Sequence, residues 1–249
     1  MNKLILYLTC SLLFLSATVI AQQPTYVFVH GAWGGAWQFK KTAEQLTQQG
    51  ANVYRVNLTG LGDRYHLASP EVNLSTHITD VVNAIMFEGL DSVILVGHSY
   101  GGMVITGVAD SIPGKIKKMI YLDAFLPEDG ESVAFYLQGN PDADLLQSED
   151  GLYVKPNWVK DTTKFPRDVP HPIATLKEKI KLDNPERLKI PTTYILTYES
   201  ALGGKEKDPF YFFSTRAQKH NFQVVGMEAD HNPQIKHLKE LVQILLTAK

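Results

Sequence analysis

Short apolar runs alternate with amphipathic stretches along most of this chain, and this alternation constrains the fold more than any other feature. Apolar runs of this length are typical of parallel strands buried on both faces, with crossover helices between them. The pattern predicts one α/β domain with about six mostly parallel strands and helices on both faces of the sheet. The predicted strands are 26–29, 52–56, 92–96, 118–122, 193–197 and 222–225, and the predicted helices are 37–49, 76–87, 100–111, 210–219 and 233–247.

The interval between the fourth and fifth predicted strands breaks this alternation. It runs from 123 to 192, about 70 residues, whereas the loops of an α/β domain usually have only a few. Its prolines are mixed with large apolar side chains, such as Trp158 and Phe165, that need burial. We therefore expect a cap region at about 128–189 that covers one edge of the sheet. A disordered insertion is the alternative.

The first 21 residues differ in composition from the rest of the chain. One charge, Lys3, is followed by an apolar run over 4–20 and by the small residue Ala21. This order predicts a secretory signal peptide over 1–21, and residues 22–249 would then form the single domain of a secreted or periplasmic protein. A membrane anchor, at the short limit of a bilayer-spanning helix, and a buried first helix are the alternatives.

Charge and cysteine content exclude several kinds of protein. The formal net charge is −2 with interspersed signs, so the sequence offers no basic surface for nucleic acid. The one cysteine, Cys10, lies in the predicted signal peptide. The mature chain would therefore lack a disulfide framework, a cysteine nucleophile and a cysteine-ligated metal site. We expect no metal, no organic cofactor and no stable membrane association after signal cleavage, and the sequence gives no indication of an oligomeric state.

The strand predicted at 92–96 runs directly into Gly97-His98-Ser99-Tyr100-Gly101 and then into a predicted helix. A strand that reverses at once into a helix holds its central residue in a strained turn, and flanking glycines leave room for the backbone there. Gly-x-Ser-x-Gly between a strand and a helix is typical of a nucleophile elbow. The motif predicts Ser99 as the nucleophile of an acyl-transfer reaction.

The first predicted strand ends at His30-Gly31-Ala32-Trp33. Acyl transfer develops negative charge on a carbonyl oxygen, and two backbone N–H groups can stabilise that charge. In sites of this type one donor lies in the loop after an early strand and the other follows the nucleophile, which indicates Ala32 and Tyr100. His30 is expected to hydrogen-bond the backbone of its own loop. The predicted pocket-lining residues are Gly31, Trp33 and His98, although turn geometry also favours packing for His98.

The general base should be a histidine after the last strand, because hydrolases of this plan place their catalytic residues in the order Ser, acid, His. His231 fits this position, and it would take the Ser99 proton and return it to the leaving group. Two carboxylates that follow strands, Asp123 and Glu199, are candidates for the acid that orients His231, and Asp123 is preferred. Asp208 is a third candidate that reads first as a helix cap.

These residues resemble those of the α/β-hydrolase superfamily. The resemblance is carried by 30–37, by 97–102, by Tyr121-Leu122-Asp123-Ala124-Phe125-Leu126-Pro127 and by Asp230-His231. Within the superfamily the chain is similar to the plant methylesterase and hydroxynitrile lyase group and its bacterial esterase relatives, the bacterial members especially over 58–64. The resemblance implies an α/β-hydrolase fold with Ser99 as nucleophile, His231 as base and an oxyanion hole at Ala32 and Tyr100.

Two departures from the plant members narrow the expected chemistry. Their triad aspartate follows the next-to-last strand, where this chain has Glu199 and a glycine-rich insertion, whereas Asp123 occupies a position from which other α/β-hydrolases orient the histidine. The lyases use a threonine and a cyanide-holding lysine where this chain has Gly31 and Asn232. The resemblance thus implies a serine esterase that cleaves a small carboxylic ester through an acyl-enzyme. A hydroxynitrile lyase, a lactone or amide hydrolase and a non-catalytic small-ligand receptor are the alternatives.

Overall fold

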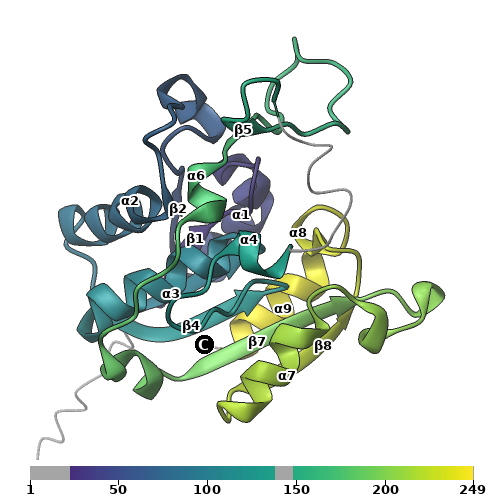
Figure 1. Ribbon diagram of the computed structural model, residues 1–249. Coiled ribbons are helices and arrows are strands. Elements are labelled where there is room, and N and C mark those ends of the chain that lie inside the picture. Colours follow the sequence, from purple (N-terminus) through teal and green to yellow (C-terminus); the bar gives the residue numbers. More distant parts are fainter. Residues whose placement is uncertain (1–22, 138–147, 249) are drawn as a thin grey trace, which may run out of the picture.

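A parallel sheet of six strands forms the centre of the protein in a computed structural model that describes residues 23–137 and 148–248 (Figure 1). The strand order is β2-β1-β3-β4-β7-β8, and every neighbouring pair is parallel. All six predicted strands are confirmed, whereas the predicted signal peptide lies outside the described residues. The strands are β1 (Thr25–Val29), β2 (Asn52–Val56), β3 (Val93–His98), β4 (Ile116–Leu122), β7 (Thr192–Tyr198) and β8 (Gln223–Glu228).

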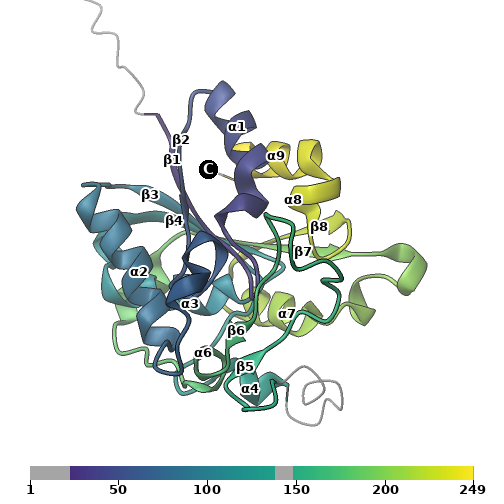
Figure 2. The same cartoon turned by 90° about the horizontal axis from the view of Figure 1, so that it is seen from above.

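Helices cover both faces of this sheet (Figure 2). Val27 and Val29 of β1 point into one buried cluster, and Tyr26 and Phe28 point into the other. Because successive side chains of a strand face opposite sides, a strand buried on both faces is apolar throughout. One face carries α1 (Lys40–Gln48) and α9 (Leu238–Thr247), and the other carries α2 (Leu74–Phe87), α3 (Gly101–Ser111) and α7 (Tyr211–Lys219).

Three helices differ from their predicted bounds by two residues or more. The helix predicted at 37–49 is a 3₁₀ turn over Ala36–Phe39 followed by α1. Helix α2 begins two residues earlier than predicted, because the Asn73 side chain accepts a hydrogen bond from the backbone N–H of Thr76, 2.9 Å away, and caps the helix. The last helix is broken at His237, whose φ of −115° and ψ of 35° are not helical. It is therefore divided into a short α8 (Pro233–Lys236) and α9, and the prediction of one helix over 233–247 was wrong.

The structure describes residues 128–137 and 148–189 of the predicted cap, and in Figure 1 their elements α4, α6 and β5 lie above the sheet. These residues contain α4 (Val133–Tyr136), α6 (Ala174–Lys177) and a two-stranded antiparallel ribbon of β5 (Tyr153–Val154) and β6 (His171–Pro172). Their buried side chains Val154, Val169 and Leu176 join the same apolar cluster as α2 and α3. Across residues 23–137 and 148–248, no helix has the length and apolar character needed to cross a bilayer.

Candidate active site

Ser99 lies in the sharp turn between β3 and α3. Its φ is 54°, a left-handed conformation that is sterically unfavourable for a residue with a side chain. The two flanking glycines are required by close backbone approach. A Cβ at Gly97 would lie 2.7 Å from the carbonyl oxygen of Gly101, and a Cβ at Gly101 would lie 2.6 Å from that of Val29. The glycines therefore let the elbow press against the end of β1.

The same turn is tied to the end of β4. The backbone N–H of Ser99 donates to the carbonyl oxygen of Leu122 at 3.2 Å, and the carbonyl oxygen of Ser99 accepts from the N–H of Phe125 at 3.1 Å. These bonds bracket Asp123, which follows β4 directly. Neighbouring parallel strands end at one edge of the sheet, and these two bonds hold Ser99 and Asp123 there together.

Asp123 is the carboxylate that contacts His231. Its Oδ2 lies 2.6 Å from Nδ1 of His231, and its Oδ1 accepts a hydrogen bond from the backbone N–H of Thr197 at 3.1 Å. Asp123 is fully buried and has a φ of 44°, a strained conformation that turns its side chain away from the strand direction. A buried carboxylate with these two partners can stabilise a positive charge on the imidazole of His231.

The ring of His231 is held between two other rings. Phe210 stacks on it with a centroid separation of 4.9 Å, and His98 lies 4.8 Å away. Nε2 of His98 donates to the backbone carbonyl oxygen of His231 at 2.8 Å. His98 is buried between Phe39 and His231, and burial lowers its pKa to about 3. The prediction that His98 lines a pocket is therefore corrected: it supports the His231 loop from beneath.

The other candidate acids do not contact His231. Glu199 is exposed where the chain leaves β7, and its side chain makes no hydrogen bond to His231. Asp208 accepts a hydrogen bond from the backbone N–H of Phe210 at 2.8 Å, in the turn before α7. The N-cap of α7 is Phe210 and no described side chain caps the helix, so the expectation that Asp208 is a helix cap was wrong. Burial, followed by the negative charge of Asp123, raises the pKa of Asp208 to about 6. The neighbouring Asp230 pairs with Lys236 instead.

Of the two predicted oxyanion donors, Tyr100 directly follows Ser99, and Ala32 follows Gly31, whose Cα lies against the Ser99 side chain. The backbone N–H groups of Ala32 and Tyr100 donate to no other described residue. Tyr100 is the N-cap of α3, so the helix dipole adds positive potential at its N–H. Nδ1 of His30 donates to the carbonyl oxygen of Gly31 at 2.8 Å, and Nε2 accepts from the N–H of Leu58. The prediction that His30 bonds the backbone of its loop is confirmed.

Gly31 and Trp33 flank the predicted oxyanion donor Ala32 in the loop after β1. A Cβ at Gly31 would lie 3.0 Å from Cβ of Ser99, so the glycine leaves space directly beside the predicted nucleophile. Trp33 has a φ of 63°, and its indole N–H donates to the carbonyl oxygen of Val154 in β5 at 2.9 Å. The edge of its ring meets Trp158 at 5.1 Å. Trp33 thus forms a wall between the oxyanion loop and the cap.

Two more histidines pack against Tyr100, and no motif in the sequence indicates their position. His77 in α2 bonds the Tyr100 hydroxyl at 2.8 Å and the carbonyl oxygen of Thr59 at 2.8 Å. His171 in β6 packs its ring 5.0 Å from that of Tyr100. Both are fully buried. Ser75, Thr76, Thr79 and Asp80 surround His77 in α2, so its sequence neighbours do not indicate burial.

The arrangement offers a nucleophile, a carboxylate-paired imidazole and two unpaired N–H donors at one edge of the sheet. The Ser99 hydroxyl itself makes no hydrogen bond to another described residue, as is common before substrate closes such a site. Within 23–137 and 148–248, no group of three or more His, Cys, Asp or Glu residues is placed to hold a metal ion.

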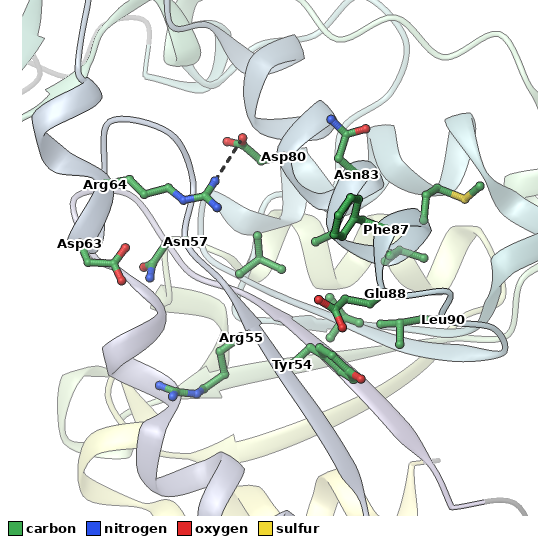
Figure 3. Close-up of a pocket in the computed structure, with 15 residues that line it drawn as sticks. Tyr54, Arg55, Asn57, Asp63, Arg64, Asp80, Asn83, Phe87, Glu88 and Leu90 are labelled. Carbon is green, nitrogen blue, oxygen red and sulfur yellow. Dashed lines mark ion pairs between the residues drawn. The ribbon is translucent and has the colours of Figure 1, made fainter.

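A separate groove of about 840 Å³ lies between β2 and α2 (Figure 3). Arg64 and Asp80 face each other across it, paired at 3.6 Å, and Phe87 and Glu88 lie along its α2 side. Neither Ser99 nor the other predicted catalytic residues line this groove. Of the residues that the structure describes, no serine or histidine lines the groove, so it lacks the reactive groups of the Ser99 site.

Comparison with known sequences places the chain among hydrolases. Residues 26–244 match a family model described as "Alpha/beta hydrolase family". A relative from Nocardioides sp. (strain SG-4G), named a carbendazim hydrolyzing esterase, is 37% identical over 88% of this chain and 97% of its own length. Plant methylesterases and a plant alpha-hydroxynitrile lyase also match, and the chain spans at most 56% of the length of these plant proteins.

Solved structures give the same result. An extracellular alpha/beta-hydrolase from a Paenibacillus species, described as sharing structural and functional homology with tobacco salicylic acid binding protein 2, has a TM-score of 0.75 and 26% identity. The match covers 90% of this chain and 98% of that one. A methylesterase from Arabidopsis has a TM-score of 0.70 and 26% identity, with the same coverage. The predicted fold and the resemblance to methylesterases, the lyase group and bacterial esterases are confirmed.

Proposed function

The chain belongs to the alpha/beta hydrolase family, and on this basis we propose that it is a serine esterase that cleaves a small carboxylic ester through an acyl-enzyme. One observation carries the proposal: the fully buried carboxylate of Asp123 lies 2.6 Å from Nδ1 of His231, at the sheet edge where Ser99 occupies a nucleophile elbow. A structural histidine has no need of a buried carboxylate, whereas a general base that becomes charged during the reaction does.

The acylation half of the reaction follows from these groups. Oγ of Ser99 attacks the ester carbonyl carbon while Nε2 of His231 takes its proton. The N–H groups of Ala32 and Tyr100 hold the negative oxygen that forms, and Asp123 stabilises the imidazolium of His231. When the carbon–oxygen bond of the ester breaks, His231 gives its proton to the departing alkoxide, which leaves as an alcohol.

The deacylation half repeats the same steps with water. His231 takes a proton from a water molecule as its oxygen attacks the acyl-enzyme, and the oxyanion again forms between the two N–H donors. The intermediate collapses, the proton returns to Oγ of Ser99 and the carboxylic acid is released. No step requires a group beyond the side chains and backbone donors named, together with water.

The esterase names of the relatives support an ester of a small, fairly apolar acid with a small alcohol, such as methanol, as the substrate class. Asn232, a neutral side chain, occupies the position after the predicted base where the lyases hold cyanide with a lysine, which disfavours the lyase reaction. The charge pattern of residues 1–21 supports export of the enzyme from the cytoplasm.

The test combines turnover with active-site labelling. Wild-type protein should hydrolyse p-nitrophenyl acetate and methyl esters of small acids, and a fluorophosphonate probe should label Ser99. Ser99→Ala should lower kcat by roughly 10⁴-fold or more and abolish labelling, because removal of the nucleophile leaves only the oxyanion hole and binding. Ser111→Ala, at the far end of α3, is the control and should keep full activity. Full turnover by Ser99→Ala, or faster cleavage of mandelonitrile than of any ester by the wild type, would contradict the proposal.

A further inference from the structure

Trp33, which directly follows the predicted oxyanion donor Ala32, is held by the cap at three polar groups. Its backbone N–H donates to Nδ1 of His171 at 3.2 Å, and its carbonyl oxygen accepts from the N–H of Val169 at 2.9 Å. Its indole N–H donates to the carbonyl oxygen of Val154 at 2.9 Å. All three partners lie in the described part of the cap, more than 100 residues away in sequence.

The hydrogen bonds around His171 fix which of its nitrogens accepts. The hydroxyl of Thr175 donates its one proton to the carbonyl oxygen of Pro172 at 2.8 Å, so towards His171 it can only accept. Nε2 of His171, 2.5 Å from that hydroxyl, therefore carries the proton. Nδ1 is left with a lone pair that faces the Trp33 N–H. Burial, reinforced by the nearby imidazoles of His77 and His30, lowers the pKa of His171 well below its usual value, so this neutral form persists.

Trp33 needs such external partners to hold its backbone in place. A φ of 63° is a conformation that a tryptophan rarely adopts, so the loop would relax if nothing held it. Residues in this region persist only where the surrounding structure fixes them. The N–H of Trp33 belongs to the peptide group that it shares with Ala32, so the bond to His171 fixes the orientation of that peptide plane.

The peptide group on the other side of Ala32 is also fixed. His30 donates to the carbonyl oxygen of Gly31, and in a planar trans peptide the N–H of Ala32 points the opposite way from that oxygen. His30 from the sheet and His171 from the cap thus hold the two peptide planes that flank Ala32. The direction of the predicted oxyanion donor depends on both histidines.

We propose that His171 is a positioning residue: its Nδ1 holds the backbone of the oxyanion loop, so that the donor geometry at Ala32 is complete only when the cap is docked. This rests on the proposed esterase function. The consequence is that the cap contributes to the chemical step as well as to the shape of the pocket. His171 touches neither substrate nor the reacting atoms and acts through Trp33 and Ala32.

The test compares substitutions that remove the acceptor with ones that keep it. His171→Leu removes Nδ1, and kcat for p-nitrophenyl acetate should fall about 10- to 100-fold with KM changed less than about threefold, because a misplaced donor weakens transition-state binding more than substrate binding. In His171→Asn, Oδ1 can stand where Nδ1 stood, so kcat should stay within about threefold of wild type, since an acceptor is retained.

A second pair of variants tests the tautomer of His171, and one further variant controls for the loss of packing. Thr175→Val removes the acceptor for Nε2 and should lower kcat about 3- to 10-fold, whereas Thr175→Ser should keep it within about twofold, because only the hydroxyl matters. Leu245→Ala opens a cavity in α9, on the opposite face of the sheet, and leaves the cap and its contacts with Trp33 in place. It should lower the melting temperature as much as His171→Leu does, yet leave kcat unchanged.

Affinity for a trifluoromethyl ketone, which forms an oxyanion on the serine, should fall in parallel with kcat across the set. The proposal fails if His171→Leu and His171→Asn have equal kcat, or if the loss of kcat follows the melting temperature in all variants including Leu245→Ala. Should His171→Leu not fold, the contrast between Thr175→Val and Thr175→Ser decides the question alone. Absence of turnover and of Ser99 labelling in the wild type would instead defeat the proposed function.

Discussion

Two regions of the molecule use histidine in opposite ways. At the sheet edge, the side chain of His231 is 38% exposed, and its Nδ1 meets the carboxylate of Asp123. Beneath and beside it, four histidines are 2% exposed or less, and their nitrogens meet backbone groups, hydroxyls or no partner at all. These four are His30, His77, His98 and His171.

The difference lies in the partners and not in the residue type. Burial penalises the charged imidazole, so the pKa values of His30 and His77 fall to about 4 and both stay neutral near neutral pH. Each then acts as a fixed donor and acceptor that holds a loop. The carboxylate beside His231 and the partial exposure of its side chain fit the proposed role of an imidazole that takes and returns a proton. The comparison predicts that changes at the two kinds of histidine have different consequences.

The largest effect is expected at His231. His231→Gln keeps a side chain of similar size but cannot carry the Ser99 proton, so kcat should fall by roughly 10⁴-fold or more, as for loss of a general base that acts as a unit with its nucleophile. His66→Gln, at an exposed loop histidine, is the matched control and should retain wild-type kcat. The measurement is steady-state hydrolysis of p-nitrophenyl acetate at pH 7.5. A kcat of His231→Gln within tenfold of the wild-type value would contradict the different roles assigned to His231 and the four buried histidines.

A smaller effect is expected in stability below pH 6.5. His77 binds a proton in the unfolded chain near its ordinary pKa of 6.5 but in the folded chain only near 4, so between these values the unfolded state holds more protons. The free energy of unfolding should therefore decrease as pH falls through this window and be fully retained above it. His77→Gln should reduce that slope by up to about 1.4 kcal/mol per pH unit, the value for one proton.

Urea unfolding of wild type and His77→Gln at several pH values between 4 and 7.5 measures this difference. Comparing slopes cancels the contribution of other groups, such as Asp208, whose raised pKa acts in the opposite direction. If the free energy of unfolding had the same pH slope in both proteins, His77 would bind its proton equally well in the folded and unfolded chains. That result would contradict the account of the buried histidines.

The fold could be predicted well because both faces of the sheet are buried. Strands β1 and β3 contain the unbroken apolar runs 26–29 and 93–96, a local property that the sequence displays directly. The break at His237 could not be predicted, because no glycine or proline marks it and the apolar spacing continues across it. The start of α2 at Leu74 is set by the Asn73 side chain, which caps the helix, and the spacing of apolar residues does not reveal such a cap.

The site could be predicted in part. Ser99 and His231 follow strands with clear boundaries, and the motif around Ser99 is local. The acid could not be chosen, since Asp123 and Glu199 both follow neighbouring strands, and only the fold shows that one carboxylate is buried and the other exposed. The bond between Trp33 and His171 joins residues 138 apart, and no periodic pattern encodes such a contact.

The central claim is that Asp123 orients His231, and parallel substitution of the three candidate acids tests it most directly. Asp123→Asn, Glu199→Gln and Asp208→Asn change charge with little change in size, and kcat/KM for p-nitrophenyl acetate is measured for each at pH 7.5. Asp123→Asn should lose about 10⁴-fold, because the amide favours the wrong histidine tautomer, while Glu199→Gln should stay within about twofold. Retained activity in Asp123→Asn with collapse in Glu199→Gln or Asp208→Asn would contradict the account.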